Sequence, residues 1–387
     1  MMGHTVLSPS AASRWLACTP SARLEERFPD NAGDFAKEGT LAHAFGETFL
    51  LGLILGENAS KEVSDRLENL RNEEFYSIEL EDYADEYAAF VWEEFCRIRK
   101  ETPDAVLRIE EKIDLTEYVP DGFGTGDAVI IADGTLTVID LKYGKGVKVS
   151  AVENKQMMLY ALGTLRRYEL LYGIDKVRMI IYQPRLGNVS EWEADVPEIK
   201  SWAKDYLAPR AAMAFKGEGD FVPGDHCRFC RAKALCKALA EKNIEAARHE
   251  FDEVGLMSDE EVAAVLAEAE GIKTWITSVE DYALKAALEG KRFPGFKLVE
   301  GRSIRKYADE GKVAETLLGF GYKEEQIYKP KELKTITAME KTLTKKTFSE
   351  LLGGLVIKPA GKPTLVPETD ARPEWSSAEA DFKEVRP

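Results

Sequence analysis

The segment between residues 126 and 142 constrains the fold more than any other part of this sequence. It holds two runs rich in β-branched residues, and Asp133-Gly134 between them is the pair typical of a two-residue hairpin turn. A hairpin with that turn places Asp127 directly opposite Asp140, with Cβ atoms roughly 4.5–5.5 Å apart. Lys142, two residues further on, lies on the same face of its strand. The sequence therefore predicts two carboxylates and an ammonium group at one end of a hairpin.

The rest of that face is apolar and consists of Val129, Ile131, Leu136 and Val138. Opposed like charges destabilise a strand pair, and burial increases the cost. A divalent cation held by both carboxylates would compensate for the repulsion. The residues alone also allow a simpler arrangement, in which Asp140 and Lys142 form a salt bridge at a strand end while Asp127 belongs to a turn.

Two helical pairs could complete such a site. His43 and Glu47 lie four residues apart in one segment expected to be helical, and Gln156 and Tyr160 have the same spacing in another. Residues four apart share one face of a helix, so each pair could act together. Taken alone, each pair is more simply a packing or surface contact.

A further carboxylate could come from the strand expected at 106–113. Glu110 and Glu111 point to opposite faces of that strand, and either could be the functional one. Apolar periodicity and turn residues predict the remaining elements. Helices are expected at about 8–17, 34–55, 80–100, 152–171, 199–215 and 259–288, and strands at 106–113, 127–132, 135–141 and 176–182.

The charge of the chain is unevenly distributed. The formal net charge of −16 taken alone argues against a nucleic-acid partner. Residues 271–365, however, hold 18 Lys and Arg against 12 Asp and Glu, a local charge of +6. We expect this basic region to guide DNA or to dock a partner protein. Net charge therefore does not exclude a nucleic-acid enzyme.

The sequence lacks the signals of export or membrane insertion. Its start has no charged and apolar segments of a signal peptide, and the apolar stretch 49–55 is too short to cross a bilayer. We expect a cytoplasmic protein, in the host cytoplasm if a phage encodes it, with no membrane partner. In that compartment cysteines are more often metal ligands than disulfides.

Three of the five cysteines form a tight motif, Cys227-x-x-Cys230-x5-Cys236. Three thiolates are one short of the usual four-ligand zinc or iron–sulfur site. Cys18 could supply the fourth ligand from the start of the chain, while His226 offers a zinc site of three cysteines and one histidine. Free thiols are the remaining alternative. Cys96 lies in an amphipathic helix and is expected to be a packed bystander.

Taken in order, these motifs resemble a known superfamily. The pieces Gly39…His43, Gly124…Asp127, Asp140-Leu141-Lys142 and Gln156…Tyr160 are similar to those of the PD-(D/E)XK nucleases. The closest likeness is the RecB/AddB-like branch, which includes the CRISPR-associated RecB-like exonucleases. Over nearly its whole length the chain also resembles a phage-borne family of unknown function within that superfamily.

The resemblance implies a role for each motif. The metal ligands would be His43, Asp127, Asp140 and the backbone carbonyl of Leu141, with Glu47 and Glu110 as additional candidates. Lys142 would orient or activate the attacking water, and Gln156 and Tyr160 would lie along the DNA path. The cation would be Mg²⁺ or Mn²⁺, and the imidazole favours Mn²⁺ somewhat. The branch also carries a 4Fe–4S cluster, which would here be held by Cys18, Cys227, Cys230 and Cys236.

The expectations for the whole chain follow. The fold class is α/β, with a mixed sheet flanked by helices, a cluster staple and a C-terminal, mostly helical α+β module. The domains are expected at 1–245 (nuclease), 246–358 (accessory) and 359–387 (extended tail). The expected function is a metal-dependent DNA exonuclease in phage recombination or replication, with a phage single-strand-binding or annealing protein as a candidate partner. The alternative is a catalytically silent DNA-binding or assembly module of the same fold.

Overall fold

The computed structural model describes residues 6–29, 33–56, 60–246, 258–299 and 310–319. It also describes the single positions 323, 336, 339, 348, 351, 352, 355 and 356. The chain divides into two compact units, Met1–Glu250 with Gly271–Lys291, and Phe251–Glu270 with Arg292–Pro387. The tail predicted at 359–387 and parts of the predicted accessory domain and of the basic region lie outside the described residues.

The centre of the first unit is a mixed sheet. Among the described residues it has the order β1 (Val106–Asp114), β2 (Phe123–Ala132), β3 (Thr135–Leu141), β4 (Lys176–Gln183) and β5 (Asn188–Asp195). Neighbouring strands are antiparallel except β3 and β4, which are parallel. Helix α6 (Lys155–Tyr172) lies between these two strands in the sequence, as a parallel crossover requires. The predicted mixed α/β class is therefore confirmed.

The register of the β2–β3 hairpin is the one that its turn predicts. Ala132 pairs with Thr135 across Asp133-Gly134, and the ladder continues to Ala128 opposite Ile139. Gly134 has a φ of 76°, the left-handed conformation that such a turn requires and that glycine adopts without strain.

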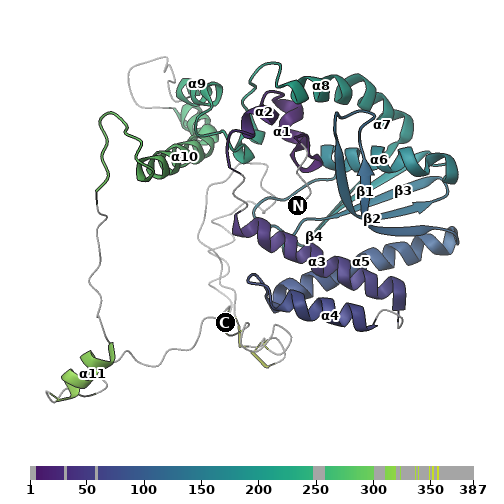
Figure 1. Cartoon of the computed structure of the whole chain (residues 1–387), viewed down its shortest axis with the longest axis horizontal. Coiled ribbons are helices and arrows are strands. Elements are labelled where there is room, and N and C mark those ends of the chain that lie inside the picture. Colours follow the sequence, from purple (N-terminus) through teal and green to yellow (C-terminus); the bar gives the residue numbers. More distant parts are fainter. Residues whose placement is uncertain are drawn as a thin grey trace. The chain divides into compact units, whose positions relative to one another are not determined.

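Helices cover both faces of the sheet (Figure 1). One face packs against α6 and the segments α1 (Ala12–Ala17), α7 (Val196–Trp202) and α8 (Ala208–Lys216). The other packs against α3 (Asp34–Leu55) and α5 (Ile78–Glu101), and α4 (Ser60–Arg71) lies on α3. Val129 and Val138 belong to the first core, whereas Ala128 and Ile139 belong to the second. Side chains along each strand of the hairpin thus alternate between two apolar layers.

Hydrogen bonds connect the beginning of the first unit to its end. Thr19 Oγ1 donates to the carbonyl of Glu218 (2.6 Å), and Arg210 Nε donates to the carbonyl of Leu16 (2.5 Å). Glu25, in α2 (Ser21–Glu25), is buried; its carboxylate pairs with Arg14 and accepts a bond from the amide of Arg231, each at 2.7 Å. These contacts bring the segment that carries Cys18 beside the segment that carries the other three clustered cysteines.

The remaining elements show where the sequence-based assignment held and where it failed. The helix predicted at 199–215 is instead α7, a π-helical turn (Ala203–Leu207) and α8. Pro209 follows the π turn, and proline cannot donate the backbone hydrogen bond that a continuous α-helix needs. Strand β5 and helix α4 were not predicted. The long helix predicted at 259–288 is present as α10 (Asp259–Leu288).

Shorter segments complete the described structure. They are η1 (Pro9–Ala11), η3 (Pro184–Leu186), η5 (Asp225–Phe229), α9 (Lys237–Ala246) and α11 (Glu310–Gly319). None of the helices in the described ranges is long and apolar enough to cross a bilayer.

Candidate functional site

Three carboxylates form a row across the sheet. Extending the hairpin register by one pair sets Asp127 opposite Asp140. The β1–β2 register runs from Ile109 opposite Ala128 to Glu111 opposite Gly126, which sets Glu110 opposite Asp127. The acidic residues of three consecutive strands therefore occupy neighbouring positions, and a concentrated negative charge results.

Strand β1 changes face at Glu110. Leu107 and Ile109 lie in the core beside α3 and α5, whereas Ile113 lies in the core beside α6. Glu110 has a φ of 47°, a left-handed conformation that costs a non-glycine residue about 1 kcal/mol or more. Because of this turn Glu111 reaches α6, where it accepts hydrogen bonds from Arg167 and Tyr168. Of the two neighbouring glutamates, it is Glu110 that lies at the carboxylate row.

His43 completes this side of the site from α3. Its Nδ1 lies 3.2 Å from Oδ1 of Asp127, and its side chain is 34 % exposed. Ligand atoms of His43, Glu110 and Asp127 all lie within 4.8 Å of one another, the only such group of metal-ligating side chains among the described residues. The other oxygen of Asp127, Oδ2, accepts a 2.8 Å bond from the amide of Leu141. Asp127 thus contacts α3 with one oxygen and the backbone of β3 with the other.

The protonation of this group reflects its crowding. Burial opposes a charged imidazole, but the charge and hydrogen bond of Asp127 outweigh it and raise the pKa of His43 to about 9. Burial and the charge of Asp127 raise the pKa of Glu110 to about 7. Asp127 keeps a lowered pKa despite burial, because of the charge and hydrogen bond of His43. A proton on the imidazole therefore supplies the positive charge that a cation would otherwise bring.

Asp140 belongs to a second network, with the residues of α6. It is 2 % exposed, and its Oδ2 lies 2.8 Å from Nζ of Lys142. Gln156 connects the group, because its Nε2 donates to Oδ1 of Asp140 (3.1 Å) and to Oη of Tyr160 (3.0 Å), while its Oε1 accepts a 2.8 Å bond from Lys142. The first turn of α6 fixes the position of Gln156. The side chain of Asn154 caps this turn by accepting hydrogen bonds from the backbone amides of Gln156 and Met157.

Tyr160 is buried, so it is not on an open surface of the described structure. Its ring lies beside Gly124, where an added Cβ would come within 2.8 Å of Pro9 and 3.0 Å of Tyr160. The glycine of the Gly-x-x-Asp motif therefore has a packing role, allowing the N-terminal segment and α6 to approach β2.

One buried oxygen atom at the site, the hydroxyl of Tyr87 in α5, has no hydrogen-bond partner among the described residues. The buried Oδ2 of Asp140 has the ammonium group of Lys142 as its partner, 2.8 Å away. Tyr87 packs in the same core as Ala128 and Leu141, the neighbours of Asp127 and Asp140 in the chain. Burial raises the pKa of Tyr87 well above its usual range, and the charges of Asp127, Asp140 and Glu110 add to this effect. Its hydroxyl therefore stays protonated and available as a donor.

The residues fit a divalent cation. Carboxylate oxygens and one imidazole are ligands that suit Mg²⁺ and Mn²⁺. A buried hydroxyl without a partner costs free energy, and the waters of a hydrated cation could accept the hydrogen bond of Tyr87. Glu47, by contrast, is paired with Arg66 at 3.0 Å, one turn along α3 from His43. Tyr87 was missed by the sequence analysis because a tyrosine in an amphipathic helix reads as an ordinary core residue.

A loop follows Lys142 and leads to α6. It carries exposed Lys145 and Lys148. Gln183, which is buried, accepts a bond from the amide of Val149 (2.7 Å) and donates to the carbonyl of Val147 (3.1 Å). The loop is thereby held against β4 with its lysines exposed. Lys155 differs from these two lysines, because its ammonium group packs over the ring of Trp202, 5.5 Å from the ring centre.

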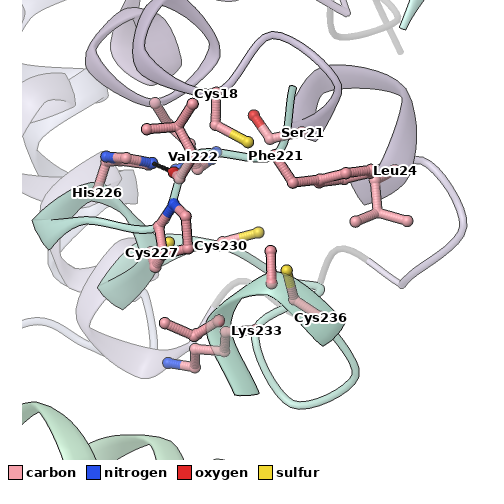
Figure 2. A pocket seen from close by; sticks show the side chains of 14 residues that line it. Cys18, Ser21, Leu24, Phe221, Val222, His226, Cys227, Cys230, Lys233 and Cys236 are labelled. Carbon is pink, nitrogen blue, oxygen red and sulfur yellow. Dashed lines mark hydrogen bonds between the residues drawn. The ribbon is translucent and has the colours of Figure 1, made fainter. Parts of the chain in front are cut away.

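Cys18, Cys227, Cys230 and Cys236 line one pocket (Figure 2). All five cysteines of the chain, each of them described, are free, and Cys96 does not line this pocket. The pocket has a volume of about 350 Å³, including the part open to solvent. The structure thus brings together thiols more than two hundred residues apart in the sequence.

The pocket around the thiols is lined by apolar side chains together with Arg14, His226 and Lys233. Burial raises the pKa of Cys18 and Cys227, and that of Cys230 to about 12. The amide of Gly224 donates to Sγ of Cys227 at 3.5 Å. His226 turns its Nε2 to the carbonyl of Val222, 2.9 Å away (Figure 2). Four thiols gathered in one pocket suit a metal centre that takes them as thiolates and releases their protons.

Comparison with known proteins identifies a family. One solved structure, described as "Crystal structure of SSO0001", is similar to 49% of this chain and 81% of its own, with 14% identity and a TM-score of 0.22, too low to establish a shared fold. The family described as "Protein of unknown function (DUF2800)" matches residues 4–373, which is nearly the whole chain. The protein therefore belongs to that family of unknown function.

Proposed function

We propose that this chain is a metal-dependent DNA nuclease of the PD-(D/E)XK type that acts as an exonuclease at DNA ends. The observation that carries the proposal is the row of Glu110, Asp127 and Asp140 across three strands, with His43 on one side and Lys142 on the other. A scaffold has no need for three neighbouring carboxylates at a buried sheet end. A site for cations and phosphate does.

The residues would divide the chemistry between them. His43, Glu110, Asp127 and Asp140 would hold one or two divalent cations. A bound cation neutralises charge on the phosphate and lowers the pKa of the attacking water. Lys142 presents an ammonium beside Asp140, where it would orient that water or stabilise the developing negative charge. Gln156 fixes both Asp140 and Lys142, so it would act as a positioning residue.

DNA would reach the site past the loop that follows Lys142. The exposed ammonium groups of Lys145 and Lys148 are suited to phosphate contacts, which favour nucleic acid without reading its sequence. The net negative charge of the chain does not oppose DNA binding. A bound cation would neutralise the carboxylates of the site, which would then no longer repel the phosphate backbone of the DNA.

We further propose that the four-cysteine pocket holds a 4Fe–4S cluster. The support is the arrangement of the thiols: Cys18, Cys227, Cys230 and Cys236 line one pocket, and all four are free. Four cysteine thiolates are the usual ligand set of such a cluster. His226, the histidine of the alternative zinc site, turns its Nε2 to the carbonyl of Val222 instead.

The function is tested by incubating the purified chain with end-labelled linear DNA and with closed circular DNA, each with Mn²⁺, Mg²⁺ or EDTA. The proposal expects metal-dependent loss of the linear substrate while the circle stays intact. Cutting of the circle would keep the nuclease but replace exonuclease with endonuclease action. Binding of DNA without cleavage under every metal condition would overturn the proposal in favour of a DNA-binding module.

A further inference from the structure

Helix α10 carries a regular apolar seam. Beginning at Val262, steps of three and four residues alternate along the helix, and every step lands on valine, isoleucine or alanine until Ala286. This alternation is the heptad pattern of helices that pack side by side along their whole length. It spans 25 positions without a polar interruption.

The seam is partly open in the structure, which describes all eight of its positions. Val262 is 37 % exposed and Ile276 is 44 % exposed, five positions are half-buried, and Ala286 is buried. The remaining apolar side chains keep surface that a second helix could cover, and covering it would be favourable in proportion to the area removed from water.

The sizes of the seam residues suit pairing with an antiparallel copy of the same helix. About a two-fold axis at the middle of the seam, Val262 faces Ala286 of the second copy, and Val265 faces Ala283. Ala269 faces Val279, and Ile272 faces Ile276. Every alanine thus faces a valine, and every isoleucine faces an isoleucine. Each layer therefore contains either one larger and one smaller side chain or two of equal size, as a filled interface requires. A parallel pair would instead stack alanine on alanine in three layers and leave them underfilled.

The charges beside the seam agree with the same orientation. Lys273 directly follows the seam residue Ile272, and Glu280 directly follows Val279. The two charges therefore lie on the same side of the seam. Helical side chains lean toward the N-terminus. In the antiparallel pair Lys273 therefore leans toward Glu280 of the second copy, and the symmetry repeats the contact. In a parallel pair Lys273 would instead face Glu268, and Glu280 would face Trp275.

We infer that α10 is a self-association surface, at which two copies of this chain pair through antiparallel α10 helices. The interface is isologous, because each copy offers the same residues to the other about a two-fold axis, as in most soluble dimers. The inference stands on the size and charge pattern of one helix and does not depend on the nuclease activity.

Sedimentation velocity of the full-length chain over a range of concentrations tests this interface. The wild type is expected to be a dimer that dissociates on dilution. Ile276→Glu places a charge in the central layer and should raise the dissociation constant by at least about 100-fold. Ala267→Glu adds the same charge on the exposed opposite face of the helix and should leave the dimer intact. A monomeric wild type, or a dimer that survives Ile276→Glu, overturns the inference.

Charge exchange tests the orientation. Lys273→Glu alone and Glu280→Lys alone should each weaken the dimer by about tenfold, and the double exchange should restore it. Circular dichroism checks that each variant keeps its helix. If Glu280→Lys has no effect and Lys273→Glu is rescued by Glu268→Lys, the helices are parallel and the antiparallel interface is wrong.

Discussion

Gly46 of α3 and the ring of Tyr87 in α5 are so close that a side chain would not fit between them: a Cβ on Gly46 would lie 2.9 Å from Cδ1 of the tyrosine. His43 lies on the same helix, less than one turn earlier, and Tyr87 extends its unpartnered hydroxyl into the core beneath the carboxylates. The close packing of these two helices therefore sets where the imidazole and the phenol stand relative to the carboxylate row.

Gly46→Ala should destabilise the protein or leave it no more stable. Overpacking costs about 1–3 kcal/mol, and the better helix propensity of alanine returns about 1 kcal/mol. The matched control is Gly39→Ala in the same helix, where no described atom lies within 4 Å of the new methyl group, so it should stabilise by up to about 1 kcal/mol. Urea unfolding of both variants measures the difference. Equal stabilisation by both would mean that α3 and α5 are not packed this closely.

Tyr87→Phe should separate metal-free stability from metal binding. The ring stays, but a buried hydroxyl without a partner is removed, and such a group costs about 1–3 kcal/mol. The free energy of unfolding in EDTA should therefore hold or rise. The rise in melting temperature caused by Mn²⁺ should shrink, because the hydroxyl can no longer donate to the hydrated site. An unchanged response to Mn²⁺ would remove Tyr87 from the site.

Gln156→Ala should lower the rate of cleavage by about 100-fold at saturating DNA, the loss expected when reacting groups shift by about 1 Å. The reason is that Gln156 alone joins Asp140, Lys142 and Tyr160 in the described network. Tyr160→Phe removes one acceptor at the edge of that network and should cost far less. Steady-state rates and KM values check this, since a loss confined to KM would assign Gln156 to DNA binding instead.

Cys236→Ala should bleach the broad visible absorption expected of anaerobically purified protein and lower its melting temperature. The cluster would close a loop of more than two hundred residues, and in the chain-entropy model a cross-link over about 100 residues is already worth roughly 4–5 kcal/mol. The first unit should still fold, because Thr19, Arg210 and Glu25 join the same two segments by hydrogen bonds. Cys96→Ala is the matched control and should change neither the visible absorption nor the melting temperature. Zinc without iron in the wild type would contradict the cluster assignment.

The hairpin shows what the sequence could specify. Asp133-Gly134 fixed one turn, and that turn predicted the register observed from Ala132–Thr135 to Ala128–Ile139, one pair short of Asp127 and Asp140. It did not predict that Asp127 pairs with His43 of α3 while Asp140 bonds Gln156 of α6. The helical spacing of Gln156 and Tyr160 likewise predicted that they share one face of their helix, where a hydrogen bond joins them. Local rules of turn and helix geometry were sufficient in these places, because the partners are close in the sequence.

Longer-range relations could not be obtained in this way. The place of Glu110 in the row depends on the β1–β2 register, and its left-handed backbone breaks the alternation that would have assigned its face. Strand β5 was missed because it is an edge strand with charged Glu191 and Glu193 among few apolar residues. Helix α4 was missed because, within the residues described, it has no buried side chain to produce an apolar period.

Cleavage by Asp140→Asn is the most direct test of the central claim. The substitution keeps the shape and most hydrogen bonds of a buried side chain but removes the charge that a cation needs, and Asp133→Asn makes the same change in the turn at the other end of the hairpin. The measurement is Mn²⁺-dependent release of label from linear DNA. We predict that the wild type and Asp133→Asn release label equally, while Asp140→Asn, folded to the same melting temperature in EDTA, releases none above the EDTA background. Release by Asp140→Asn at the wild-type rate would contradict the account.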